Sequence, residues 1–288
     1  MRFFYFYHMK QLSNFLIPGK HGKPMVTDVV FQENQIPKPI VVFVHGYKGF
    51  KDWGAWSSMA AQFAAAGFFF VKFNFSHNGG TPEQPIDFPD LEAFGNNNYS
   101  KELDDLGSVL DWLEQEDSVQ KEVDLNHIYL IGHSRGGGMV LLKANEDNRV
   151  KKVITLASVS DYKSRFPQGT DFEAWKEQGV YYVVNGRTQQ EMPHYFQFYE
   201  DFVQNEGRLT IEKATRNLAI PHLIIHGNQD TSVSIQEAEN LKRWNPNATY
   251  EVIEGADHVF NVKHPWTEDD LSAEMQFMVD RSIAFLKE

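Results

Sequence analysis

A serine flanked by glycines stands where a strand-forming segment gives way to a helix-forming one. Residues 127–131 (HIYLI) precede Gly132-His133-Ser134-Arg135-Gly136, and residues 136–144 have the composition of a helix. A G-x-S-x-G turn between a strand and a helix is typical of a strained backbone that exposes a serine hydroxyl. The helix that follows would direct free backbone N–H groups at the space beside that hydroxyl. We therefore predict that Ser134 is a nucleophile; a tight turn with an incidental serine is the alternative.

A serine nucleophile needs a general base, and the base needs a third group that orients it. Asp230 follows the strand-like residues 223–226, and His258 follows the strand-like residues 250–253. Both would lie at the carboxyl ends of strands, the edge at which parallel sheets place their ligands. The chain order of serine, acid and histidine also accompanies this kind of serine turn. We predict Asp230 as the acid and His258 as the base.

Other side chains compete for these two roles. Asp257 is too near His258 in sequence to reach its ring comfortably, and Asp161 ends an earlier strand. His77 also follows a strand but precedes the serine, so we expect it to shape the pocket or to pack against the loop at 45–49. We interpret the remaining rival histidines as structural or surface residues: His133, His222, His226 and His264.

A glycine-containing loop offers donors for a developing negative charge. His45-Gly46-Tyr47-Lys48-Gly49 follows residues 40–44 (IVVFV), which read as a short buried strand. A tetrahedral intermediate requires fixed N–H donors, and loss of one costs roughly 2.7–4 kcal/mol. We predict that the backbone N–H groups of Tyr47 and Arg135 are these donors; an ordinary loop is the alternative. We expect His45 to pack the loop rather than to react, and place it with Gly46 beside the substrate.

A sheet must position these residues, and the rest of the chain has the sequence pattern of such a sheet. Strand-like and helix-like segments alternate, which predicts a mostly parallel sheet with helices on both faces. Leu103, Leu106, Leu110 and Leu113, for example, recur at helical spacing. Besides the segments already named, we expect a hairpin of 12–17 with 26–31, strands at 68–75 and 153–156, and helices at 56–66, 99–114, 235–244 and 268–286.

Residues 158–221 interrupt the alternation where a single crossover helix would suffice. Asn185-Gly186, after residues 181–184, predicts a hairpin with a type I′ turn, and 196–203 and 211–216 could be short helices. The segment has too few aliphatic residues for a core of its own. We predict a cap-like insertion within one domain spanning residues 1–288. Its aromatic residues would form a pocket wall or pack it onto the sheet: Trp175, Tyr181, Tyr182, Tyr195, Phe196, Phe198 and Tyr199.

Composition excludes several classes of protein. Lys and Arg number 27 against 39 Asp and Glu, a net charge of -12, which argues against nucleic-acid binding. The absence of cysteine excludes disulfides, thiolate metal sites and a cysteine nucleophile. The histidines show no metal-binding spacing, and no window approaches the ~18 apolar residues of a membrane span. Hydrophobic residues make up 42%, enough for a sizeable core.

The amino-terminal run MRFFYFYHMK is aromatic and apolar. Its apolar part is short, His8 and Lys10 end it, and no Ala-x-Ala cleavage site follows, so it matches a secretory signal poorly. We therefore expect a cytoplasmic protein, for which the absence of cysteine is suitable, and keep export as the alternative. Met9 is an alternative start.

With these motifs in place, the chain resembles the α/β-hydrolase superfamily from about residue 26 to its end. Within it the sequence looks most like the dienelactone-hydrolase-like and cinnamoyl/feruloyl-esterase-like group, and is also similar to the catalytic domains of prolyl-oligopeptidase-type peptidases. The motifs that carry the resemblance are residues 45–49, residues 132–137, the Gly-Asn-Gln-Asp turn ending at Asp230 and the Gly-Ala-Asp-His turn ending at His258.

The resemblance implies an eight-stranded sheet, a Ser134–His258–Asp230 triad and an insertion that caps the pocket. The chain also departs from these relatives. A dienelactone hydrolase proper would use a cysteine nucleophile, and the prolyl-type peptidases carry a propeller domain for which this chain has no room. Residues 187–193 (RTQQEMP) form no motif whose ligand we can name.

The first functional hypothesis is hydrolysis of a small-molecule carboxylic ester through an acyl-enzyme, which needs no cofactor or metal. In it, His77, Trp175, Tyr182 and Tyr195 join His45 and Gly46 as substrate contacts. The second is a peptidase or amidase that releases small acyl or aminoacyl groups. An acidic subsite for a free amino terminus would favour it, and the insertion offers Glu173, Glu177, Glu191 and Glu200. The third is a binding module without catalysis. These patterns do not specify the natural substrate or the oligomeric state.

Overall fold

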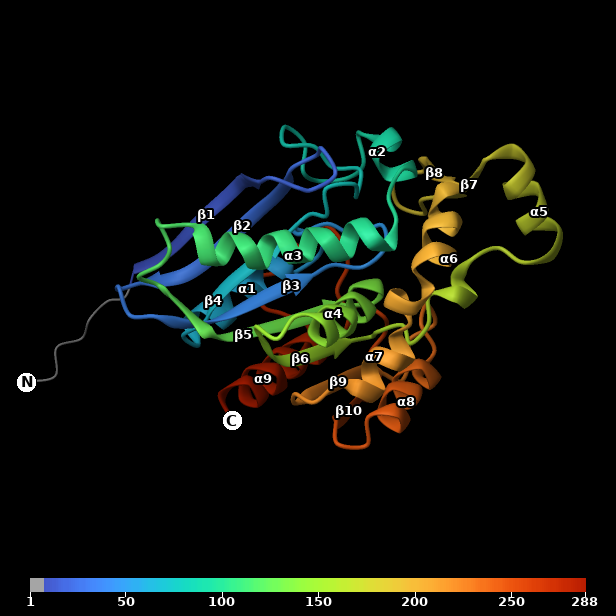
Figure 1. Ribbon diagram of the computed structural model, residues 1–288. Coiled ribbons are helices and arrows are strands. Elements are labelled where there is room, and N and C mark those ends of the chain that lie inside the picture. The colour runs from blue at the N-terminus through green and yellow to red at the C-terminus, as the bar shows by residue number, and fades with distance from the viewer. Residues whose placement is uncertain (1–7) are drawn as a thin grey trace, which may run out of the picture.

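The computed structural model describes residues 8–288, and its main sheet has eight strands (Figure 1). The strand order is β1-β2-β4-β3-β5-β6-β9-β10. β2 pairs antiparallel with β1 and with β4, and the other neighbouring pairs are parallel. The expectation of a mostly parallel eight-stranded sheet is confirmed. The strands are β1 (His8–Ile17), β2 (Met25–Glu33), β3 (Lys38–Val44), β4 (Phe69–Phe73), β5 (Val123–His133), β6 (Val150–Leu156), β9 (His222–Gly227) and β10 (Thr249–Ile253).

Helices cover both faces of this sheet, and each face has its own buried core. In β3 the side chains of Ile40, Val42 and Val44 belong to one core, and those of Val41 and Phe43 belong to the other. This is the two-residue alternation of a strand buried on both faces. The first core includes α3 (Tyr99–Gln115), α4 (Arg135–Glu146), α7 (Ile211–Asn217) and α8 (Ile235–Trp244); the second includes α1 (Trp56–Ala65) and α9 (Ala273–Lys287).

The closing helix is shorter than the sequence suggested. It begins at Ala273 rather than near residue 268, because the Ser272 side chain accepts a hydrogen bond from the Met275 N–H and caps the helix there. A short helix, α2 (Leu91–Gly95), capped by Asp90, was not expected.

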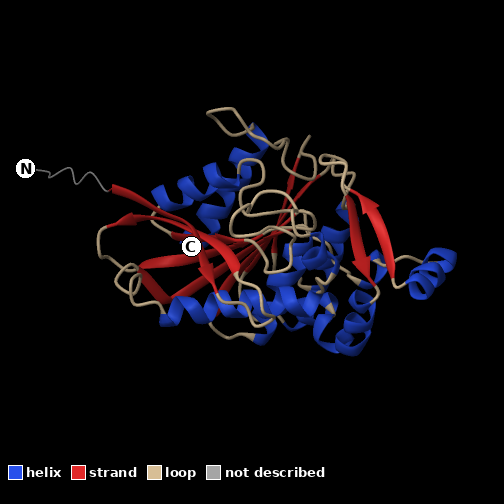
Figure 2. Ribbon diagram, turned by 90° about the horizontal axis from the view of Figure 1, so that it is seen from above, coloured by secondary structure: helices blue, strands red, loops and turns tan. Residues whose placement is uncertain are grey.

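Residues 158–221 lie between β6 and β9, beyond one end of the sheet (Figure 1). They contain a 3₁₀ turn (Lys163–Arg165), α5 (Gly169–Gln178), β7 (Val180–Val184), β8 (Glu191–Tyr195), α6 (Gln197–Leu209) and α7. β7 and β8 form a two-stranded antiparallel sheet that stands apart from the main one (Figure 2).

The hairpin expected here is present, but its turn differs from the expected type. Val184 pairs with Glu191, so residues 185–190 form the connection instead of a two-residue Asn-Gly turn. The Asn185 side chain accepts hydrogen bonds from the N–H groups of Arg187 (3.0 Å) and Thr188 (3.3 Å) and thereby stabilises the longer loop.

The insertion shares a core with the sheet. Phe166, Trp175, Phe198 and Phe202 belong to the same buried cluster as the leucines of α3. Phe166 contacts Phe198 and Phe202 at ring-centroid distances of 5.3 and 5.2 Å. The arrangement is compatible with a single domain; the division into one domain and a cap stays a prediction.

Residues 1–7, which hold most of the aromatic start and bear on the signal-peptide alternative, lie outside the described residues. Of the helices in residues 8–288, none is both long and apolar enough to cross a membrane.

Candidate active site

Ser134 occupies a strained turn between β5 and α4. Its backbone angles are φ 56° and ψ −120°, a region that costs energy for any residue with a Cβ. The turn is held by hydrogen bonds from Ser134 N–H to the Leu156 carbonyl (2.9 Å) and from Gly137 N–H to the Ser134 carbonyl (3.0 Å). The serine is therefore fixed at the carboxyl end of the sheet, as its sequence context predicted.

Glycines allow the backbone to close tightly around this serine. A Cβ on Gly136 would lie 2.7 Å from the His45 carbonyl oxygen and closer still to that of Val44. A Cβ on Gly46 would lie 2.9 Å from the Ser134 Cβ. Since real Cβ atoms essentially never approach so closely, these two glycines are what permit the loop after β3 to pack directly on the serine turn.

Asp230 and His258 are in contact. Asp230 Oδ2 lies 2.7 Å from His258 Nδ1, and Asp230 Oδ1 accepts hydrogen bonds from the N–H groups of Ser232 and Val233, both at 2.8 Å. The carboxylate is 0% exposed. Burial alone would raise the pKa of Asp230, but the hydrogen bonds from His226 and His258 outweigh it and hold that pKa well below its usual range. Asp230 is thus an anion at neutral pH and orients the His258 ring.

His133 supports the His258 loop from the serine turn. Its Nε2 donates to the His258 carbonyl oxygen at 2.9 Å, and the two rings lie 4.8 Å apart. Burial lowers the pKa of His133 to about 3, so this ring stays neutral. His258 and Ser134 line one cavity, although no hydrogen bond joins them within residues 8–288. Such contacts are often long before a substrate binds.

Two residues that line this cavity have backbone N–H groups without a hydrogen-bond partner in residues 8–288. Arg135 is the first residue of α4, so its N–H has no partner within the helix, and no acceptor is bonded to the Tyr47 N–H within residues 8–288. The Tyr47 hydroxyl is already engaged, since it lies 2.9 Å from His194 Nε2. His194 Nδ1 lies 3.2 Å from the Met192 carbonyl, which assigns the proton to Nδ1 and leaves Nε2 to accept from Tyr47.

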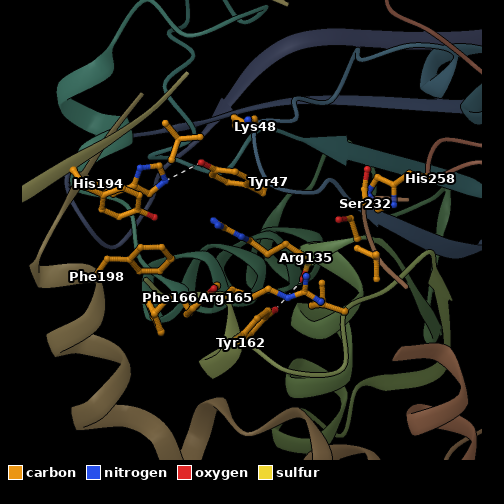
Figure 3. A pocket seen from close by; sticks show the side chains of 16 residues that line it. Tyr47, Lys48, Arg135, Tyr162, Arg165, Phe166, His194, Phe198, Ser232 and His258 are labelled. Carbon is orange, nitrogen blue, oxygen red and sulfur yellow. Dashed lines mark hydrogen bonds between the residues drawn. The ribbon is translucent and has the colours of Figure 1, made fainter. Parts of the chain in front are cut away.

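A cavity of about 480 Å³ separates the serine turn from the insertion. Figure 3 shows His258 and Ser232 at one end and His194 and Phe198 at the other, with Arg135 between them. Its lining is Tyr47, Lys48, Tyr99, Ser134, Arg135, Val159, Tyr162, Arg165, Phe166, Tyr181, Val183, His194, Phe198, Ser232, Val233 and His258.

A second cavity of about 270 Å³ reaches the same serine. It shares Tyr47, Lys48, Ser134 and His258 with the first cavity. Its other lining residues are His45, Gly46, Gly49, Trp53, Trp56, His133, Asn185, Arg187, Val259 and His264. Two cavities therefore open onto Ser134.

Only two of the six expected substrate contacts line these cavities. His45 and Gly46 line the smaller one. His45 also accepts a hydrogen bond from the Phe75 N–H at 3.3 Å, and burial lowers its pKa to about 4, so the ring is neutral and packs the loop as expected.

The other four expected contacts lie outside both cavities, so their role as substrate contacts stays a prediction without support from this geometry. Trp175 is buried inside the insertion, where its indole N–H donates to the His194 carbonyl at 2.8 Å. Tyr182 is 58% exposed, because on β7 it points to the opposite side from Tyr181. The Tyr195 hydroxyl bonds Glu92 at 2.5 Å, and His77 Nδ1 bonds the Ser76 hydroxyl at 2.8 Å.

Several lining residues were not expected from the sequence. Tyr99 begins α3, and its ring stacks on Tyr162 at 3.9 Å, so both reach the cavity from segments that carry no motif. Arg165 and His194 are further examples, brought in by the fold of the insertion. Within residues 8–288, no group of three or more His, Asp or Glu side chains is arranged to hold a metal ion.

The sequence model of the alpha/beta hydrolase fold family matches residues 39–190 and 175–265 of this chain. The chain belongs to this family. The resemblance to the α/β-hydrolase superfamily drawn from its motifs is confirmed.

Solved structures share its fold over nearly the whole chain. Est1E from Butyrivibrio proteoclasticus, solved with ferulic acid bound, aligns with a TM-score of 0.72 at 17% identity and covers 95% of this chain and 98% of its own. A dienelactone hydrolase from Anabaena variabilis aligns with a TM-score of 0.63 at 15% identity, covering 97% of each chain. At such identities the likeness concerns the fold alone.

Sequence relatives match shorter stretches. The alpha/beta hydrolase is 27% identical over 184 residues to the uncharacterized peptidase YtmA of Bacillus subtilis, which is 63% of this chain and 59% of that protein. It is 26% identical over 127 residues to the quorum-quenching protein AidA of Acinetobacter baumannii, which is 44% of this chain and 38% of that protein. The matches thus span between about two fifths and three fifths of the length of these relatives.

Proposed function

We propose that this hydrolase cleaves carboxylic esters through an acyl-enzyme formed on Ser134. One observation carries the proposal: a serine on a strained turn shares a cavity with His258, whose Nδ1 lies 2.7 Å from the buried Asp230 carboxylate. A serine hydroxyl is a weak nucleophile unless such a base is at hand.

The proposed reaction runs in two halves. Ser134 Oγ attacks the ester carbon while His258 Nε2 takes its proton, and the carbonyl oxygen becomes an oxyanion held by the N–H groups of Tyr47 and Arg135. His258 then protonates the leaving alcohol, and the acyl group stays on Ser134. Water, deprotonated by the same imidazole, releases the acid and restores the serine. Asp230 stabilises the imidazolium in both halves.

The charges around the site favour an ester over a peptide with a free amino terminus. An aminopeptidase needs an acidic subsite, for which Glu173, Glu177, Glu191 and Glu200 were candidates. Within the described residues, neither cavity is lined by any of these, nor by another Asp or Glu. An ammonium group would instead meet Lys48, Arg135 and Arg165. Because one relative is named as a peptidase, the experiment below also includes a peptidase substrate.

We propose that residues 158–221 cover the site as a cap. The insertion contributes Tyr181, Val183, His194 and Phe198 to the cavity wall opposite Ser134. Tyr162 and Phe166, also of the insertion, and Tyr99 of α3 complete an aromatic enclosure that suits an apolar or aromatic substrate arm. The proposed chemistry requires no cofactor.

The test is hydrolysis of p-nitrophenyl acetate, butyrate and octanoate beside methyl ferulate and an aminoacyl anilide. Ser134→Ala should abolish ester turnover, with a loss on the order of a million-fold in kcat. Ser164→Ala, at an exposed serine outside both cavities, is the matched control and should retain activity. Cleavage of the anilide alone would favour the peptidase. Failure to cleave any substrate would favour a binding module, and equal activity in Ser134→Ala would overturn the assignment of Ser134 as the nucleophile.

A further inference from the structure

The cavities at Ser134 are lined by cationic side chains in a protein that is acidic overall. The chain has a net charge of -12, yet within residues 8–288 neither cavity is lined by an Asp or a Glu. The larger cavity is lined by Lys48, Arg135 and Arg165, and the smaller by Lys48 and Arg187. A cleft with charge of one sign and low-dielectric walls concentrates ligands of the opposite sign.

The arginines at the site already have carboxylate partners. Arg135 Nη1 lies 3.2 Å from Glu102 Oε1, and its guanidinium is covered by aromatic rings, Tyr47 at 4.4 Å among them. Arg165 pairs with Glu237, and Arg187 pairs with Asp87. Their positive charges are largely neutralised where they stand, so they shape the cavities more than they attract a ligand.

Lys48 differs from these arginines. Within residues 8–288 its ammonium forms no hydrogen bond or ion pair, and its recorded contact is the face of Tyr47, 5.1 Å from the ring centroid. It lines both cavities and lies beside Tyr47 (Figure 3), the residue whose N–H is the proposed oxyanion donor. Partial burial also lowers the pKa of the Lys48 ammonium.

We propose that Lys48 is a specificity-determining residue that binds a carboxylate on one arm of the ester substrate. The inference rests on the proposed ester hydrolysis and adds the substrate class, a half-ester or a carboxylated ester. One unpartnered ammonium matches the single negative charge of a carboxylate. Because Lys48 lines both cavities, either arm of the substrate can present its carboxylate there.

A different role for Lys48 leads to a different result. If the ammonium stabilised the oxyanion itself, its removal would slow neutral and charged esters alike. If it binds a substrate carboxylate, its removal slows only the charged esters. The two roles are therefore separated by comparing substrates that have the same shape and differ in charge.

The experiment measures kcat/KM for two matched pairs of esters. The acyl-arm pair is mono-p-nitrophenyl adipate and p-nitrophenyl 6-methylheptanoate, and the alcohol-arm pair is 3-carboxyphenyl butyrate and 3-isopropylphenyl butyrate. The variants are Lys48→Met, Lys48→Arg and the charge control Lys151→Met. Lys151 is exposed near the amino-terminal end of β6, away from both cavities. Thermal unfolding of each variant verifies that it is folded.

We expect the wild type and Lys151→Met to prefer the charged ester of at least one pair by about tenfold or more, as a charge-assisted hydrogen bond would give. Lys48→Met should lose this preference because hydrolysis of the charged ester slows by more than that of the neutral ester, and Lys48→Arg should retain it. The preference should also weaken at high salt.

The proposal is overturned if neither pair shows a preference while the neutral esters are hydrolysed, or if Lys48→Met slows both members of a pair equally. In these cases ester hydrolysis itself stands. If no ester is hydrolysed by the wild type, the proposed function fails first and this inference fails with it.

Discussion

Asp230 combines full burial with a negative charge, and this combination makes its contribution to stability dependent on pH. Its pKa in the folded protein is held well below the value of about 3.9 expected in the unfolded chain. A depressed pKa gives stability that is present above about pH 4 and is lost as the pH falls towards the folded-state value. Asp230→Asn removes this dependence.

We therefore expect the difference in unfolding free energy between wild type and Asp230→Asn to shrink between pH 5 and pH 3. Chemical denaturation across that range measures it. A difference that stays constant or grows on acidification would mean that the Asp230 carboxylate is not stabilised by His226 and His258 in the folded protein.

The proposed role of Tyr47 in catalysis belongs to its backbone and not to its side chain. Its hydroxyl is bonded to His194 at 2.9 Å, and the proposed oxyanion donor is its N–H. Tyr47→Phe should therefore keep kcat within about fivefold, whereas loss of a true oxyanion donor costs roughly a hundredfold to a thousandfold. Steady-state kinetics on p-nitrophenyl butyrate decides between them. A loss of a hundredfold or more in the folded variant would transfer the donor role to the hydroxyl.

At the scale of elements, the serine turn depends on close approach of three backbone segments. Gly136→Ala would force its Cβ into the carbonyl groups of Val44 and His45. We expect a destabilisation of about 1–3 kcal/mol, typical of overpacking, together with a loss of activity as the turn shifts. Gly186→Ala is the control, since nothing lies within 4 Å of its added Cβ. Equal melting temperatures for the two variants would contradict this account of the turn.

At the scale of elements, the strands and helices were predicted from the sequence, whereas most of the pocket-lining residues were not. Regular strands and helices were predictable because their apolar periodicity is local, and Ser134, Asp230 and His258 stand out because each follows a strand. The residues of the pocket wall were not predictable, because lining a pocket depends on the direction in which each side chain points. Tyr181 and Tyr182 are neighbours of the same type, yet one lines the cavity and the other is exposed.

Tyr99 and Arg165 illustrate a second limit. They reach the cavity only because α3 and the insertion pack together, and long-range packing leaves no local pattern. Likewise the cap of Ser272, rather than helical periodicity, decides where α9 begins.

For the whole molecule, the shared core predicts that the insertion and the sheet unfold together. Phe198 and Phe202 of α6 lie in one buried cluster with Leu141 of α4. Hydrogen exchange in increasing denaturant should show the amides of α6 and α4 losing protection at the same concentration, as in one cooperative unit. Earlier opening of α6 would identify the insertion as an independent lid.

The measurement that tests the central claim most directly is covalent labelling of the active serine. A fluorophosphonate reacts with an activated serine and stays attached, so peptide mass spectrometry can locate the adduct. We predict a single adduct on Ser134, formed in the wild type and absent from Ser134→Ala. An adduct on another residue, or ester hydrolysis that persists without any adduct, would contradict the account.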